Sequence, residues 1–240
     1  MEQLAYYLQQ NNSKRILDVG TGVGNFIFVL AQTTNEYDEI IGIDTSQRAI
    51  EIASNYFLDN HKVKFMKMDG KKIEYPDGYF DVVCLSNSLH HLENPQPIFN
   101  EMKRVLKREG LMIIQEMVCE PLTNQQVSHR LVHHFSAEID RHLGLTHDDT
   151  YTKEVIEEKL SQFDSIELIA AWVPEYQNKH EFSDEEVTQL ISSIDQMIDR
   201  IKDIEKKPYY QDKAELIKQY IKENGFDLAT EYMFILKKTV

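Results

Sequence analysis

Three glycines alternate directly after a short apolar run near the start of the chain, in the stretch ILDVGTGVGNF. Gly20, Gly22 and Gly24 leave the backbone bare, so it can turn tightly and lie against a ligand. The dinucleotide fingerprint G-x-G-x-x-G is not completed, because Asn25 or Ile27 stands at its last position, depending on which glycine begins the count. No Gly-Lys-Ser/Thr follows, so the P-loop is also absent. The loop therefore predicts close contact with a ligand other than a pyrophosphate.

Acidic residues stand at the ends of three apolar runs around this loop. Asp44 comes 20 residues after Gly24, where a carboxylate can accept both ribose hydroxyls of an adenosine. Asp69 is suited to accept a hydrogen bond from an adenine amino group, and Asp18 to orient the loop or, through water, to bind an ammonium group. Each acid alone equally suits a strand-end turn or a helix N-cap. Together, three acids and a bare loop favour a cationic adenosine ligand, because they would repel pyrophosphate.

The elements expected to position these residues alternate between strands and helices. The apolar runs are short and apolar on both faces, which is typical of strands buried in a parallel sheet. The expected strands are Arg15–Val19, Glu39–Asp44, Val63–Met68, Phe80–Ser86 and Leu111–Glu116, and the expected helices lie near Asn25–Thr33, Ser46–Asn60 and Pro95–Leu106. This alternation predicts right-handed crossovers and a doubly wound α/β sheet.

The second half of the chain has a different pattern. A histidine-rich helical stretch covers Pro121–Leu143. Next we expect an amphipathic helix over Thr152–Phe163, with Thr152 as its N-cap, and a strand over Ile166–Val173. A long helix over Ser183–Lys206, which begins with a capping box, is expected after them. Pro208 is expected to break that helix, before a helix over Tyr209–Glu223 and an antiparallel strand within Ala229–Val240. The two late helices are interpreted as a lid or packing layer rather than a separate domain.

These stretches together resemble the class I S-adenosylmethionine-dependent methyltransferases. The resemblance covers roughly residues 14–118 and rests on LDVGTGVG (17–24), IGIDTS (41–46), MDGKKIEYPDGYFDVVCLSNSLHHLENP (68–95) and EMKRVLKREGLMIIQE (101–116). It implies one domain with a seven-stranded sheet in the order 3-2-1-4-5-7-6, strand 7 antiparallel. Helical cap insertions are expected at about 119–150 and 181–224.

The resemblance also implies that S-adenosyl-L-methionine binds along the strand ends. The loop glycines are expected beside its methionine part, Asp44 on the ribose, and Ser86 and Asn87 at the methionine end. The full expected set is Asp18, Gly20, Thr21, Gly22, Gly24, Asp44, Thr45, Met68, Asp69, Gly70, Ser86 and Asn87. Gly70 departs from the family pattern, where a small apolar residue is common.

Methyl transfer from a sulfonium is an in-line displacement that needs an aligned acceptor and, for a protonated acceptor, a base. His90 and His91 follow the strand expected at 80–86, and Glu116 ends the strand expected at 111–116. His91 and Glu116 are therefore expected catalytic residues, together with His134 from the cap. The motif NSLHHL is common in the family across unlike substrates, so a role in starting a helix is the alternative for its histidines.

Five of the nine histidines fall within the 19 residues from His129 to His147. At about 100° per residue, His129 and His133 share one helical stripe with Asp140, and His134 lies on a second stripe. His129, His133 and His147 form a predicted divalent metal site with N/O ligands, which would hold an oxygen acceptor and lower its pKa. The alternatives are a partly solvated helix and a base or acceptor-positioning role for His134 without metal.

The composition limits the class of partner. With 26 basic and 40 acidic residues the net charge is −14, which disfavours nucleic-acid binding. No run reaches the roughly 18 apolar residues of a membrane span, the start lacks a secretory signal, and two cysteines suit a cytoplasmic protein. The predicted function is methyl transfer to a small molecule. The alternatives are a non-catalytic S-adenosylmethionine sensor or partner subunit and, disfavoured by the broken fingerprint, a nicotinamide oxidoreductase.

Overall fold

A seven-stranded sheet in the order β3-β2-β1-β4-β5-β7-β6 forms the centre of the molecule. The computed structural model describes residues 2–34, 36–175 and 181–239. The strands are β1 (Arg15–Val19), β2 (Glu39–Asp44), β3 (Val63–Lys67), β4 (Phe80–Ser86), β5 (Leu106–Met117), β6 (Ile166–Trp172) and β7 (Glu231–Lys238). The first five pair in parallel, and β7 runs antiparallel to both β5 and β6. The predicted fold class and strand order are confirmed.

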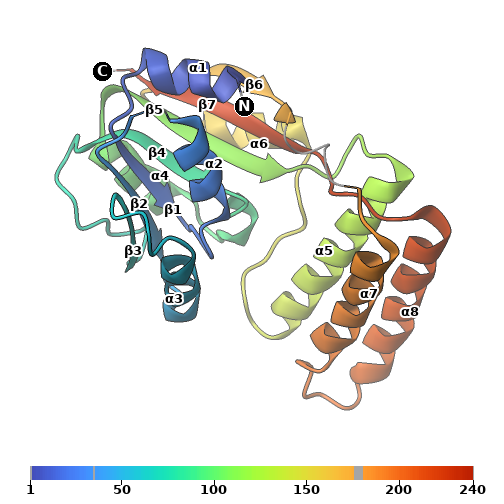
Figure 1. Cartoon of the computed structure of the whole chain (residues 1–240). Helices are drawn as coiled ribbons and strands as arrows, with labels where there is room; N and C mark the ends of the chain where they lie inside the picture. The colour runs from blue at the N-terminus through green and yellow to red at the C-terminus, as the bar shows by residue number, and fades with distance from the viewer. Residues whose placement is uncertain (1, 35, 176–180, 240) are drawn as a thin grey trace.

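Helices cover both faces of this sheet (Figure 1). On one face, α1 (Glu2–Gln10) and α2 (Asn25–Thr33) share an apolar cluster with the sheet. On the other face, α4 (Gln96–Val105) and α6 (Lys153–Ser161) share a second one. The helix α3 (Gln47–Tyr56) packs along β2 and β3. Along β5, Leu111 and Ile113 face the first cluster while Met112 and Ile114 face the second, which explains the continuous apolar run in the sequence.

Three helices form a separate packed unit beside the sheet (Figure 1). They are α5 (Asn124–His142), α7 (Asp184–Ile198) and α8 (Lys207–Asn224). Their shared core contains Phe135 of α5, Ile194 of α7 and Ile217 of α8, all buried. This helical unit joins the two segments predicted as caps, although they are distant in sequence.

Several predicted helix boundaries were wrong: the helix expected over Ser46–Asn60, for example, ends at Tyr56. The helix expected over Ser183–Lys206 begins as predicted, with a capping box between Ser183 and Glu186, but ends at Ile198. Pro208 does not break a helix; it lies in the first turn of α8, where its missing N–H would be unpaired anyway. The Asp203 side chain accepts from the N–H groups of Glu205 and Lys206 just before this turn. Of the strand expected within Ala229–Val240, Val240 lies outside the described residues.

Candidate active site

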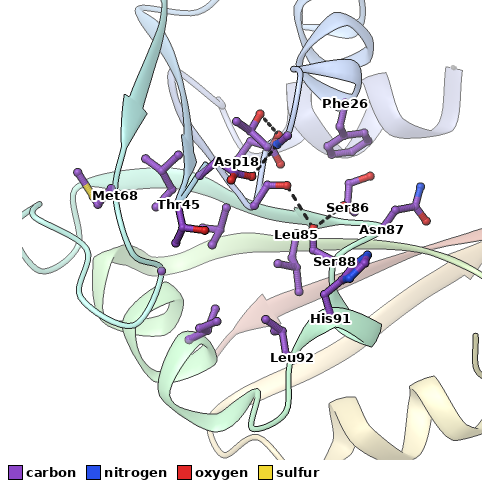
Figure 2. Close-up of a pocket in the computed structure, with 18 of the residues that line it drawn as sticks. Asp18, Phe26, Thr45, Met68, Leu85, Ser86, Asn87, Ser88, His91 and Leu92 are labelled. Atoms are coloured by element: carbon purple, nitrogen blue, oxygen red, sulfur yellow. Dashed lines mark hydrogen bonds between the residues drawn. The ribbon is translucent and has the colours of Figure 1, made fainter. Parts of the chain in front are cut away.

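A cavity of about 550 Å³ opens at the carboxyl ends of β1, β2 and β4. That volume is within the range of small-molecule sites. Every residue predicted to hold the cofactor lines this cavity except Gly24. Figure 2 shows Thr45 and Met68 at one end, and Asn87, Ser88 and His91 at the other. The predicted adenine and methionine ends are therefore the two ends of one cavity.

The glycine loop adopts a backbone that favours glycine. Gly20 and Gly22 have φ values of 68° and 53°. A Cβ on Gly20 would lie 2.8 Å from Ser88 Oγ, whereas a Cβ on Gly22 would meet no atom within 4 Å and would project into free space. Gly24 corrects the prediction, because it N-caps α2 with φ 88° and packs against Phe65. Its role is to start the helix rather than to line the cavity.

Asp44 holds the glycine loop against β2. Its Oδ2 accepts the Gly22 N–H at 3.0 Å and its Oδ1 accepts the Ser46 N–H at 2.8 Å. Each carboxylate oxygen has a second lone pair, so both can still accept a hydroxyl. Asp44 therefore combines a position in the cavity with free acceptor capacity, as a ribose-binding carboxylate requires.

Asp18 lies beneath the loop and is 1% exposed. Its Oδ2 accepts the Thr21 hydroxyl at 2.7 Å, while its Oδ1 is buried and has no hydrogen-bond partner. Burial raises the pKa of Asp18 to about 7, and the nearby Asp44 adds to that effect while the Thr21 hydroxyl opposes it. An unpaired buried oxygen at the cavity wall fits a ligand with a cationic group.

We expect S-adenosylmethionine affinity to rise with pH because of Asp18. The free protein holds this carboxyl protonated below about pH 7, and only the ionised form attracts an ammonium group. Affinity should increase about tenfold between pH 6 and pH 8, following the ionised fraction of a group with pKa 7. In the unliganded protein the same group lowers stability as pH rises from about 4 to 7, because the unfolded chain ionises first.

Calorimetric titration across this pH range measures the first effect. Asp18→Asn cannot ionise, so it should bind more weakly at pH 8 and lose the slope. An unchanged slope in Asp18→Asn would assign the pH dependence to another group.

Of the three residues predicted to be catalytic, His91 alone lines the cavity. Its ring packs against His90 and His147, with centroids 4.4 Å and 4.0 Å away. Burial, and then the electrostatic effect of His90 and His147, lower the pKa of His91 to about 4. At neutral pH His91 therefore presents a neutral imidazole at the end of the cavity predicted to hold the methionine part.

Glu116 does not face the cavity as predicted, because it is 0% exposed beneath the turn after β4. That turn contains the 3-10 helix η1 (Leu89–His91). Glu116 Oε1 accepts the N–H groups of Ser88 and Leu89 at 2.8 and 2.6 Å, and Oε2 accepts from His90 Nδ1 at 2.8 Å. Glu116 is thus a positioning residue for the histidine turn.

His134 is likewise not at the cavity. Its Nε2 accepts the Thr150 N–H at 3.1 Å and lies 2.8 Å from the Thr150 hydroxyl. The ring nitrogen that a base would use is therefore occupied by the loop after α5. The geometry gives His134 a structural role in fixing that loop, which corrects the prediction.

The predicted metal ligands converge only in part. His133 and His147 lie together, with ring centroids 5.0 Å apart. His129 does not join them, because its Nδ1 accepts the Ala229 N–H at 2.9 Å and its ring packs on Phe226. His90 takes the place predicted for His129, with its ring centroid 4.9 Å from that of His133. Helical periodicity alone does not show this, because His90 comes from a distant turn.

One residue of the site, Ser88, and one contact of the predicted Asn87 were not predicted. Ser88 lies over Gly20 and donates to Gly20 O at 3.2 Å and to Ser86 O at 3.0 Å. Asn87 has φ 46° and donates to Glu231 on β7 at 2.8 Å. Burial raises the pKa of Glu231. Of these features, only the positive φ at Asn87 had a signal in the sequence, because asparagine tolerates this backbone region better than most residues do.

The family is shown by the comparison with family models. A model described as "Methyltransferase domain" matches residues 10–159, which is more than half of the chain. The chain belongs to the class I S-adenosylmethionine-dependent methyltransferases.

Curated relatives of this family match over the cofactor-binding half. The chain is 26% identical over 105 residues to the ubiquinone/menaquinone biosynthesis C-methyltransferase UbiE of Azotobacter vinelandii, covering 42% of each protein. It is 27% identical over 133 residues to the sterol 24-C-methyltransferase erg6 of Aspergillus fumigatus, covering 54% of the chain and 35% of that protein. The chain spans about half the length of the curated relatives it matches first.

Solved structures match over the whole chain. The [4+2]-cyclase SpnF aligns with a TM-score of 0.63 and 21% identity, covering 100% of this chain and 81% of that one. YjhP from E. coli aligns with a TM-score of 0.60 and 15% identity, covering 99% and 91%. At such identities the likeness shows the fold alone.

Proposed function

We propose that the protein transfers the methyl group of S-adenosylmethionine to a small-molecule acceptor. The observation that carries this proposal is the single cavity that gathers the bare glycine loop, the free acceptor capacity of Asp44 and the unpaired oxygen of Asp18. When bound, the cofactor supplies an electrophilic methyl group on a sulfonium. The acids of the cavity suit a cationic adenosine and disfavour a pyrophosphate cofactor.

Each part of the cavity wall has its own task. Asp44 accepts the ribose hydroxyls while its carboxylate keeps the Gly22 amide in place. Asp69 and Met68 flank the adenine. Asp18 faces the ammonium group, directly or through water. Ser86 and Asn87 border the methionine end, where the methyl group leaves toward the acceptor.

The acceptor belongs at the His91 end of the cavity. His91 is the residue from the predicted catalytic set that reaches this space, and its neutral ring can accept a hydrogen bond from an acceptor held nearby. Relatives named as a ubiquinone/menaquinone biosynthesis C-methyltransferase, a sterol 24-C-methyltransferase and a phosphoethanolamine N-methyltransferase support a small organic acceptor. Among the described residues, no helix has both the length and the apolarity to cross a membrane.

The helical unit is proposed to border the acceptor rather than the cofactor. His133 of α5 lies against His90, one residue from His91. The described residues that line the cavity include none from α7 or α8, so those helices support α5 instead of covering the cofactor. A lid role for residues 183–223 therefore stays a prediction that requires movement of the whole unit.

Asp44→Ala is expected to weaken S-adenosylmethionine binding about 30-fold, or roughly 2 kcal/mol. The change removes a charged acceptor of ribose hydroxyls and releases the glycine loop. Asp69→Ala is the matched control, because it removes a carboxylate from the same cavity but only one neutral contact to adenine. Calorimetry measures both. Unchanged affinity in Asp44→Ala, or tighter binding of NAD than of S-adenosylmethionine by the parent protein, would overturn the cofactor assignment.

A binding protein without chemistry is the second candidate. The [4+2]-cyclase SpnF shares the fold, so the fold alone does not fix a reaction. Incubation with methyl-labelled cofactor and panels of quinone, sterol-like and amine acceptors separates the two. Label transferred to an acceptor, and lost in Asp44→Ala, supports the enzyme; tight cofactor binding without turnover on any panel supports the sensor.

A further inference from the structure

Three histidines from separate segments meet beside the cavity, two of them, His133 and His147, from the predicted metal set and the third, His90, not. His90 belongs to η1 after β4, His133 to α5, and His147 to the loop after α5. One ring nitrogen from each lies within 4.8 Å of the others. His90 Nε2, His133 Nδ1 and His147 Nε2 are all buried and have no hydrogen-bond partner among the described residues. We call these three residues the histidine trio.

Three unpaired nitrogens at one point need an explanation. A buried polar atom without a partner costs about 1–3 kcal/mol, so three together are costly. A shared ligand that accepts three nitrogen lone pairs removes this cost, and a metal cation does so in one step. Metal–nitrogen bonds of 2.0–2.1 Å in a tetrahedral site place the nitrogens about 3.4 Å apart, so each ring would shift by roughly 1 Å or less.

The outer nitrogens of two trio members are already held by carboxylates. Glu116 Oε2 accepts from His90 Nδ1 at 2.8 Å, and Asp140 Oδ2 accepts from His147 Nδ1 at 2.6 Å. Such hydrogen bonds leave the proton on Nδ1 and direct the Nε2 lone pairs inward, which is the usual second layer around metal-binding histidines. The two carboxylates also place negative charge beside a divalent cation, part of which Arg200, after α7, offsets by pairing with the other oxygen of Asp140.

We propose that the histidine trio binds a divalent transition-metal ion of the zinc type, which clamps α5 and the loop after it to the turn that carries His91. Three imidazoles favour such an ion over magnesium or calcium, which prefer oxygen ligands. The three nitrogens are buried and none of the trio lines the cavity, so the ion is a structural clamp rather than a Lewis acid on the acceptor. Metal binding does not depend on the proposed methyl transfer.

Zinc binding to the full-length chain tests the proposal. The protein is stripped with a chelator and titrated with Zn²⁺, and separately with Co²⁺, whose absorption spectrum reports coordination. One ion per chain and a tetrahedral cobalt spectrum, with a water as the fourth ligand, are expected. His133→Ala, at a half-buried position, should weaken Zn²⁺ binding at least 100-fold, while cofactor affinity confirms that the variant is folded.

Two further variants test whether His90 is a ligand and whether Zn²⁺ binding is specific to the histidine trio. Glu116→Gln turns the partner of His90 Nδ1 into a donor, which forces the ring proton onto Nε2, and a 10- to 100-fold loss of Zn²⁺ affinity is expected. His142→Ala removes an exposed histidine from the same helix and should bind Zn²⁺ as the parent does. No stoichiometric Zn²⁺ in the parent protein, or equal binding in His133→Ala, would overturn the site. Equal binding in Glu116→Gln would remove His90 from it.

Discussion

Glu116→Ala is expected to lower the free energy of unfolding by about 4 kcal/mol, because it leaves three buried donors without an acceptor. The donors are the N–H groups of Ser88 and Leu89 and the Nδ1–H of His90. The side chain is fully buried, so these hydrogen bonds form away from bulk water in the parent protein. Urea unfolding followed by circular dichroism measures the loss.

Glu116→Gln is the matched control for stability. One amide oxygen can still accept both backbone N–H groups, and the amide nitrogen can donate to His90 in its other tautomer. The expected loss is therefore about 1 kcal/mol. If Glu116→Ala were no less stable than Glu116→Gln, the turn after β4 would be held by its packing and not by this carboxylate.

Phe135→Ala is expected to unfold the helical unit at a lower temperature than the sheet. Phe135 is 1% exposed in the core shared by α5, α7 and α8, and such a truncation costs about 3–5 kcal/mol. The unit has its own apolar core, separate from the two clusters on the sheet. Part of the structure can therefore open while the rest stays folded.

Two probes separate these events. Trp172 is the sole tryptophan, lies on β6 and stacks on Tyr7 of α1, so its fluorescence reports the sheet, whereas far-UV circular dichroism also reports the helices. Non-coincident melting curves and near-parental cofactor affinity are expected. Phe99→Ala is the control, because Phe99 is equally buried but packs under the sheet. Coincident curves for Phe135→Ala with loss of cofactor binding would show one cooperative domain.

Several strand and helix bounds in the cofactor-binding half of the fold could be predicted from sequence, because the residues that end each of these elements lie next to it in the chain. The strands β1, β2 and β4 and the helix α2 have the predicted bounds, since apolar runs there end at glycine, aspartate or serine. The end of α7 at Ile198 could not be predicted from sequence, because the segment after it is as polar as the helix itself. Helix α1 was not predicted; its Leu4 and Leu8 become apolar contacts only once the sheet exists.

The candidate site divides in the same way. The carboxyl ends of neighbouring parallel strands meet at one edge of a doubly wound sheet. The fold class therefore predicted that Asp18, Asp44 and the first two loop glycines would lie together. The histidine trio did not, because His90 and His133 are brought together by packing of α5 against the turn after β4. Burial also decided roles that residue type left open: Glu116 is sealed beneath that turn, and Gly24 packs on Phe65.

The position of β7 has a consequence for how the protein is made. A ribosome delivers β5 and β6 well before residues 231–238, yet β7 lies between those two strands. Until it arrives, β5 presents an open edge and β6 has no neighbour in the sheet, which are the conditions that favour misassociation of nascent chains. Completion of the sheet is therefore a late step in synthesis, and premature termination before residue 231 would leave two strands available to other chains.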